Sequence, residues 1–291
     1  MKKDQVIHAL AWNDSVRVVA ASMTETVQDA VRIHGTDATA SAALGRALIG
    51  ARLLQASVKD TERITLQVKG FGPVGLIVAR AEPNGDIYGS IQNPDVHLPP
   101  REDGKLDVGM AVGWVGDLTV VRETSKHAEP YVGVTELVSG EIGDDIANYL
   151  VTSEQIKSAV VLGVMMGPDG EVRSAGGVIV QILGGIEDEV IDELEKRIHA
   201  LENLSERMSE GATAEDLLQL VCGDEARILD TRATKYHCDR GRSYYAERLA
   251  ALDARSLVGL FEEDDSIELT CEFTRETFTF TRGDFPQMPE A

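Results

Sequence analysis

Two cysteines near the carboxyl end of this 291-residue sequence, Cys238 and Cys271, have residue types and spacing suited to metal or redox chemistry. Cys238 precedes an expected helix and Cys271 lies in an expected hairpin, and small domains hold a tetrahedral zinc ion between two such arms. A structural zinc site takes four ligands, and this segment holds only two thiols. His237 or Asp239 could add a ligand. The sequence therefore predicts either an incomplete metal site or two buried thiols without metal.

A glycine-rich motif elsewhere in the chain resembles a nucleotide-binding loop. The stretch Gly70-Phe71-Gly72-Pro73-Val74-Gly75 matches G-x-G-x-x-G and follows an expected strand. The nucleotide motif needs a helix next, whereas residues 76–79 form a short β-type run. We interpret the motif as a turn between strands. No H-E-x-x-H or G-x-S-x-G pattern occurs in the sequence, and we predict that the protein is not an enzyme.

The charge and composition limit the partners. The net charge is −21, and residues 184–291 hold 12 Lys and Arg against 26 Asp and Glu. Such a field repels phosphate backbones and anionic lipid, so we expect neither nucleic-acid nor membrane binding. No apolar run reaches the roughly 18 residues of a membrane span, and three cysteines do not make a secreted disulfide framework. We expect a cytoplasmic protein.

Hydrophobic periodicity predicts an α+β fold with antiparallel strands and packed helices. The expected strands and helices follow one another without a βαβ repeat: strands 5–11 and 16–21, a helix over 38–58, strands 64–69, 74–80, 86–92, 118–122 and 131–139, a helix over 144–154, and strands 159–166 and 172–183. The pattern then becomes helical after Gly184-Gly185. We predict a core domain over residues 1–183, a helical linker over 184–231 and a small carboxyl-terminal domain over 232–291.

Five sequence blocks, in order, resemble those of the heat-shock protein 33 family of redox-regulated chaperones. The blocks are Thr39-Ala40-Ser41-Ala42-Ala43-Leu44-Gly45-Arg46, Gly70-Phe71-Gly72-Pro73-Val74-Gly75, Gly104-Lys105-Leu106-Asp107-Val108, Ser139-Gly140-Glu141-Ile142-Gly143-Asp144-Asp145 and Ala175-Gly176-Gly177. The resemblance covers essentially the whole chain. It implies an ATP-independent holdase, which binds unfolding proteins under oxidative stress and prevents their aggregation.

The resemblance also shows what this chain lacks. In that family the tail carries C-x-C and C-x-x-C motifs, which bind zinc when reduced; oxidation pairs neighbouring thiols, releases the metal, unfolds tail and linker and favours dimers. Cys238 and Cys271 match the first cysteine of each motif, whereas Arg240 and Thr274 occupy the second positions. We therefore expect zinc binding to be lost or much weakened.

Because the tail holds only two thiols, its redox chemistry should also differ from that of the family. A single disulfide, Cys238 to Cys271, is available in the tail if their Cα atoms come within about 7 Å. It would close a long loop and stabilise the tail by roughly 3–4 kcal/mol. We therefore expect oxidation not to activate the protein by the family's usual route.

Three functions remain open at this point. The first is a holdase that is constitutively active or triggered by heat or another unfolding stress. The second is a dimeric adaptor or assembly protein on the same fold, and the third is a thiol enzyme in which His237 activates Cys238. For the holdase, the client-binding surface would include the apolar face of the linker helix, namely Val190, Ile191, Leu194 and Ile198.

Overall fold

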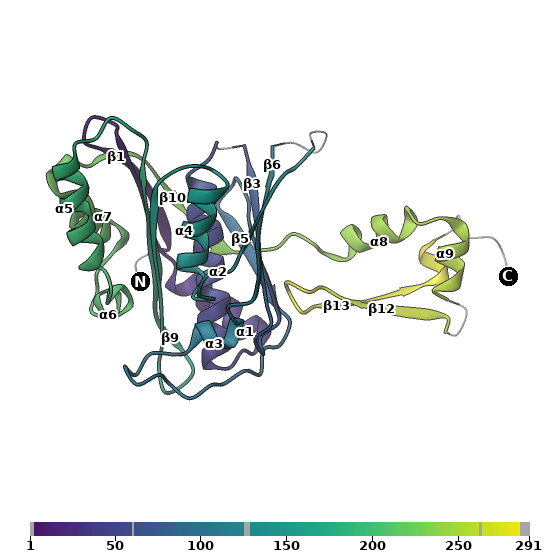
Figure 1. Ribbon diagram of the computed structural model, residues 1–291. Coiled ribbons are helices and arrows are strands. Elements are labelled where there is room, and N and C mark those ends of the chain that lie inside the picture. The colour runs from purple at the N-terminus through teal and green to yellow at the C-terminus, as the bar shows by residue number, and fades with distance from the viewer. Residues whose placement is uncertain (1–2, 60, 125–128, 262–263, 286–291) are drawn as a thin grey trace. The chain divides into compact units, whose positions relative to one another are not determined.

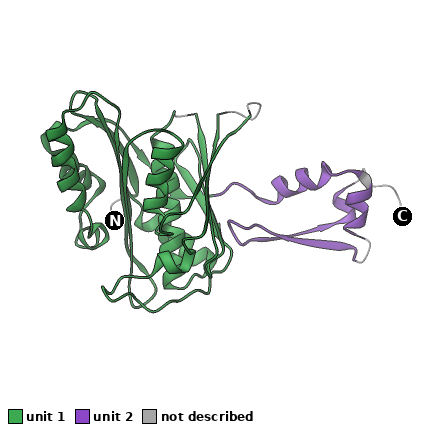
Figure 2. Cartoon of the chain, viewed as in Figure 1, with its two compact units in different colours: residues 1–237 green, residues 238–291 purple. Residues whose placement is uncertain are grey.

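The computed structural model describes residues 3–59, 61–124, 129–261 and 264–285. The chain forms two compact units, residues 1–237 and residues 238–291 (Figure 2). Apolar clusters lie within each unit. Helices occur beside mainly antiparallel sheets, which confirms the predicted α+β class. No helix in the described ranges is both long and apolar enough to cross a membrane.

Two sheets form the framework of the first unit. The first sheet has the order β10-β1-β2-β9-β8 and is antiparallel throughout, with strands β1 (Gln5–Ala11), β2 (Val16–Ser22), β8 (Ser158–Met166), β9 (Val172–Ile182) and β10 (Arg227–Ala233). The second sheet has the order β11-β5-β4-β3-β6-β7, with strands β3 (Arg63–Gly70), β4 (Leu76–Ala81), β5 (Asp86–Ile91), β6 (Gly116–Glu123), β7 (Tyr131–Glu136) and β11 (Lys235–Tyr236). β11 pairs parallel to β5, and the other pairs are antiparallel.

The helix α2 (Ala38–Ala56) lies between the two sheets (Figure 1). Its residues are buried almost all round, as expected for a helix enclosed by other elements. Small residues allow this close approach: a Cβ added at Gly50 would lie 2.4 Å from Cδ1 of Ile146. Three further helices belong to this part of the unit: α1 (Thr24–His34), α3 (Val108–Val112) and α4 (Gly143–Thr152).

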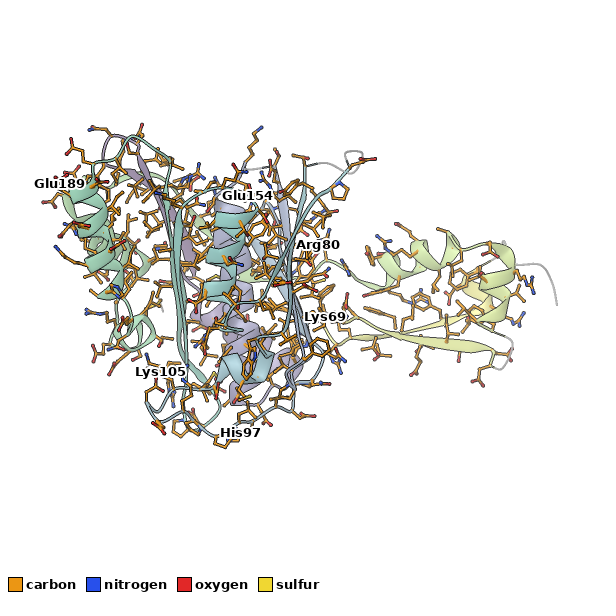
Figure 3. The ribbon with its side chains drawn as sticks, viewed as in Figure 1. Lys69, Arg80, His97, Lys105, Glu154 and Glu189 are labelled. Atoms are coloured by element: carbon orange, nitrogen blue, oxygen red, sulfur yellow. The ribbon has the colours of Figure 1, made fainter. Side chains whose placement is uncertain are left out.

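Ion pairs connect the strands of the second sheet to each other and to the segment after α4. Arg80 on β4 pairs with Glu123 on β6 at 3.0 Å. Arg122 on β6 pairs with Glu62 at 2.9 Å and with Glu154 at 3.2 Å. Arg80 and Glu154 are both labelled in Figure 3. These pairs are partly buried, so they are less screened by salt than fully exposed ones.

The predicted linker forms three helices, α5 (Asp188–His199), α6 (Leu204–Ser209) and α7 (Ala214–Cys222), on the face of the first sheet opposite α2 (Figure 1). Thr213 and Asp216 form the capping box that begins α7. After α7 the chain returns to the first sheet as β10, which was not expected within a helical linker. The boundaries predicted at 183/184 and 231/232 stay predictions, and the compact units meet at 237/238.

The second unit consists of two short helices and a hairpin: α8 (Arg242–Ala250), α9 (Ala254–Gly259), β12 (Ser266–Thr270) and β13 (Thr277–Thr281). Apolar side chains from all four elements and the turn after β13 gather in one cluster. The fully buried members, here called the phenylalanine cluster, are Leu249, Leu257, Phe261, Phe280 and Phe285. The helix after Cys238 and the hairpin that contains Cys271 agree with the elements expected there.

The glycine-rich motif is a turn between β3 and β4, as predicted. Its backbone hydrogen-bonds to the last residues of α3 rather than leading into a helix: Gly72 N–H donates to Val112 O at 2.8 Å and Val74 N–H to Ala111 O at 3.1 Å. A Cβ at Gly72 would lie 2.2 Å from Ala111 O, so glycine is required by the close approach of the two backbones.

Candidate functional site

Cys238 and Cys271 lie on the two arms that the sequence predicted. Cys238 is in the loop before α8, and Cys271 begins the turn between β12 and β13. Backbone hydrogen bonds close that turn, from Cys271 N–H to Glu276 O at 2.8 Å and from Arg275 N–H to Cys271 O at 2.9 Å. Arg275 has a φ of 59°, a left-handed conformation found in tight turns. Both cysteines are free thiols in this structure.

Cys271 is buried and accepts hydrogen bonds from several donors. Burial raises its pKa, but the Thr274 and Tyr245 hydroxyls and the amides of Thr274 and Phe273 favour the thiolate and hold the pKa below the ordinary value for a thiol. The Thr274 oxygen is itself held by Glu276 N–H at 3.3 Å. The hydrogen-bonding partners therefore stabilise negative charge on Cys271.

Cys238 is half-buried and behaves in the opposite way. Burial raises the pKa of its thiol to about 11, although the backbone amide of Arg240 and the Arg240 charge act against this rise. The charge of the Cys271 side chain contributes to the rise in the pKa of Cys238. Since an activated nucleophile needs a depressed pKa, this environment does not favour Cys238 as the thiol of an enzyme.

Arg240 and Thr274, at the positions where the resemblance implied thiols, both contact the site. The Arg240 guanidinium lies 4.6 Å from the ring centroid of Phe273 and 5.2 Å from that of Tyr244. Its Nη1 lies 3.7 Å from Oε1 of Glu272. The side chains that meet here, called the thiol cluster below, are Cys238, Arg240, Tyr244, Tyr245, Cys271, Phe273 and Thr274.

The donor set of the thiol cluster does not fit a four-coordinate zinc ion. Among the described residues, no three His, Cys, Asp or Glu side chains come together as a possible metal site. The role of His237 as a ligand stays a prediction; its backbone N–H donates to Ile87 O at 3.0 Å. A guanidinium beside Cys238 also disfavours a second cation there, because like charges repel.

The predicted client-binding residues lie on the face of α5 that packs against the first sheet. Leu194 is 2% exposed, and Val190, Ile191 and Ile198 are half-buried. The sheet beneath contributes apolar side chains of β2 and β9, such as Val18 and Val180. A cavity of about 270 Å³ lies at this interface, lined by α5 residues and by residues of β8 and β9. The interface is therefore apolar but incompletely filled.

An exposed apolar patch on the first unit was not predicted from the sequence. Phe71 is 88% exposed, Trp114 58%, Val115 58% and Met110 49%. Phe71 N–H donates to Val115 O at 3.0 Å, which holds the two loops side by side. The sequence signal was limited to single apolar residues next to glycines, because the loops are separated by about 40 residues and meet only in the folded chain. These four residues are called the apolar patch below.

Comparisons with known proteins agree with this architecture over nearly the full chain. A family model described as Hsp33 protein matches residues 4–281. The 33 kDa chaperonins of Bacillus pumilus (strain SAFR-032) and Listeria monocytogenes serotype 4a (strain HCC23) are each 39% identical, and each match covers 99% of this chain and 98% of the relative. The crystal structure of the 33 kDa chaperonin (heat shock protein 33 homolog) from Thermotoga maritima matches with a TM-score of 0.87 at 34% identity, covering 97% of this chain and 96% of that one.

These matches include both compact units, so the fold and the tail together define a protein of the 33 kDa chaperonin class. The chain belongs to the Hsp33 family, which confirms the resemblance seen in the five sequence blocks. Membership supports a chaperone function in the stress response. Arg240 and Thr274 occupy the two tail positions where the resemblance implied cysteines.

Proposed function

We propose that this protein is an ATP-independent holdase that binds unfolding proteins and prevents their aggregation, without the zinc and disulfide switching of the family. We place it in the cytoplasm, as a homodimer when active, with no role in nucleic-acid or membrane binding. We propose no enzymatic activity, in agreement with the raised pKa of Cys238. The family and the names of the relatives support the chaperone part of this proposal.

The observation that carries the proposal is the incompletely filled interface under α5. Leu194 is the one fully buried residue of this helix, and a pocket of about 270 Å³ that is open to solvent lies between part of the helix and the ends of β8 and β9. Missing contacts reduce the dispersion energy of an interface, so α5 should detach at a lower cost than a well-packed helix. Its detachment would expose two matching apolar faces, one on the helix and one on the first sheet. Unfolded proteins offer apolar surface with little fixed geometry, which such faces can bind.

The apolar patch offers a second surface for clients. Phe71 and Trp114 are exposed in the folded chain, so this surface needs no opening step. Aromatic side chains bury much apolar area on contact. The patch therefore favours a protein with some holdase activity in its reduced and folded state.

Light scattering from a heat- or denaturant-unfolded client tests the proposal. The protein is added fully reduced, after peroxide treatment, and untreated, with ATP absent. Strong suppression of scattering by the reduced form is the expected result. Suppression only after peroxide would show that two cysteines suffice for redox activation. No suppression under any condition, including heating, would instead favour an adaptor or assembly protein on this fold.

A further inference from the structure

The thiol cluster contains two residues in positions where the family pattern has thiols, and both make contacts of their own. We propose that the Arg240 guanidinium takes the structural place of the metal ion, joining the loop 238–241 to the loop 271–276, so that the second unit folds without zinc. Any role of this site in regulating client binding rests on the proposed holdase function. Its role in folding the second unit does not depend on that function.

The contacts of Arg240 reach both arms of the second unit. Phe273 and Glu272 belong to the loop between β12 and β13, whereas Tyr244 lies in the first turn of α8. One guanidinium stacks on rings from both arms, at 4.6 Å and 5.2 Å, and approaches the Glu272 carboxylate at 3.7 Å. The Arg240 side chain is only 16% exposed. A planar guanidinium suits this role, because it can stack on aromatic faces and form ion pairs at once.

Charge in the cluster is consistent with this role. The Arg240 charge acts to lower the pKa of Cys238 and of Tyr245, as a bound cation at this position would. At Cys271, the hydroxyls of Thr274 and Tyr245 already donate to the sulfur that a metal would need. A zinc ion would have to displace these donors and the guanidinium.

The phenylalanine cluster reaches this end of the unit through the partly buried side chains of Tyr245 and Phe278, which pack against it. Its buried members come from α8, α9, β13 and the turn after β13, and Phe273 is not among them although it is 3% exposed. The Arg240 guanidinium instead lies over the Phe273 ring. The end of the unit with the thiols is thus held by the contacts of Arg240 together with the packing of Tyr245 against the apolar cluster.

The contacts of Arg240 should be easier to break than the coordination of a metal ion. Glu272 is 61% exposed, so water and salt screen its pairing with Arg240. Cation–π contacts are individually modest, whereas a four-thiolate zinc site accounts for much of the folding energy of a small domain. We therefore expect the second unit to open on moderate heating and to be indifferent to chelators.

Hydrogen exchange with mass spectrometry on the full-length reduced protein tests the inference. Peptides that cover residues 238–250 and 271–276 are followed with and without a zinc chelator, in the wild type and in Arg240→Gln. The matched control is Arg248→Gln, because Arg248 stacks on the same Tyr244 ring at 4.5 Å but lies on α8 itself. We expect no effect of the chelator, and an increase of about tenfold in exchange at both loops in Arg240→Gln alone.

Two results would overturn the inference: faster exchange of the wild-type loops after chelation, or equal exchange in Arg240→Gln and the wild type. The double variant Arg240→Cys/Thr274→Cys provides a second measurement. It completes both cysteine motifs, and we expect it to bind about one zinc per chain, measured by metal analysis, and to become sensitive to chelation. If the wild type binds as much zinc as this variant, Arg240 has not replaced the metal. None of these measurements uses a client, so the holdase function can fail while the inference stands, and the reverse.

Discussion

Replacing Leu194 by alanine should turn the reduced protein into a stronger holdase. Leu194 is 2% exposed and is the anchor of α5 on the first sheet, beside a cavity that is already unfilled. Removing a buried leucine side chain costs about 3 kcal/mol when the site does not collapse around the gap. The detached helix exposes this side chain to water, so the cost falls on the closed state alone. Since 1.4 kcal/mol is a factor of ten, the open population should rise roughly 100-fold.

Two assays follow this change in Leu194→Ala. Hydrogen exchange at the amides of α5 reports the opening itself, and light scattering of an unfolded client reports holdase activity. The control is Leu53→Ala, since Leu53 is fully buried on α2 between the two sheets and its loss destabilises the unit without releasing α5. We expect both assays to respond in Leu194→Ala and neither to respond comparably in the control. Faster exchange at α5 with unchanged scattering would refute the proposal that clients bind the face under this helix. Unchanged exchange would refute the proposal that α5 detaches from the sheet at a low free-energy cost.

Three further predictions concern the apolar patch and the thiols. The double variant Phe71→Ser/Trp114→Ser should lower aggregation suppression by the reduced protein several-fold while its melting temperature stays nearly unchanged, because exposed side chains contribute within about 0.5 kcal/mol to stability; a large loss of stability with intact suppression would contradict this. Peroxide treatment should join Cys238 to Cys271 and make the tail more resistant to protease, by roughly 3–4 kcal/mol of stability; a tail digested faster after oxidation would show the reverse. Finally, the pKa of Cys238 is raised from the ordinary 9.0 to about 11 in the folded tail. Between these two values the thiol is deprotonated in the unfolded chain but still protonated in the folded one, so the stability of the tail should fall as the pH rises from 9 to 11. Hydrogen exchange of the tail measured from pH 9 to pH 11 should show this fall in the wild type and much less of it in Cys238→Ser.

The elements with regular patterns were predicted well. The strands β1 to β9 and the helix α2 lie within a few residues of their expected positions, since alternation and helical periodicity both report burial along one element. β10 was missed because Arg227–Ala233 is an edge strand with little buried apolar surface, held by backbone pairing with β1. The short helices α3 and α6 were missed because five or six residues carry too little periodicity.

The candidate site was predicted only in part. The placement of Cys238 before a helix and Cys271 in a hairpin was expected and is observed. The stacking of Arg240 on Phe273 was not, because an arginine in a sequence carries no sign of which distant ring it will meet. Likewise, the apolar face of α5 is visible in its periodicity, whereas the cavity beneath it depends on how the helix sits on β8 and β9.

The amino-acid sequence by itself predicted the α+β class from local periodicity, and its resemblance to a known family implied both the family and the two tail positions where a thiol is replaced. Only the tertiary structure decided that a guanidinium lies between the two arms, that hydroxyls cover Cys271, and that two loops form one exposed apolar patch. The physical reason is the range of the interactions. Periodicity records the burial of single elements, while cation–π contacts, thiol hydrogen bonds and unfilled cavities exist only where segments far apart in the chain meet.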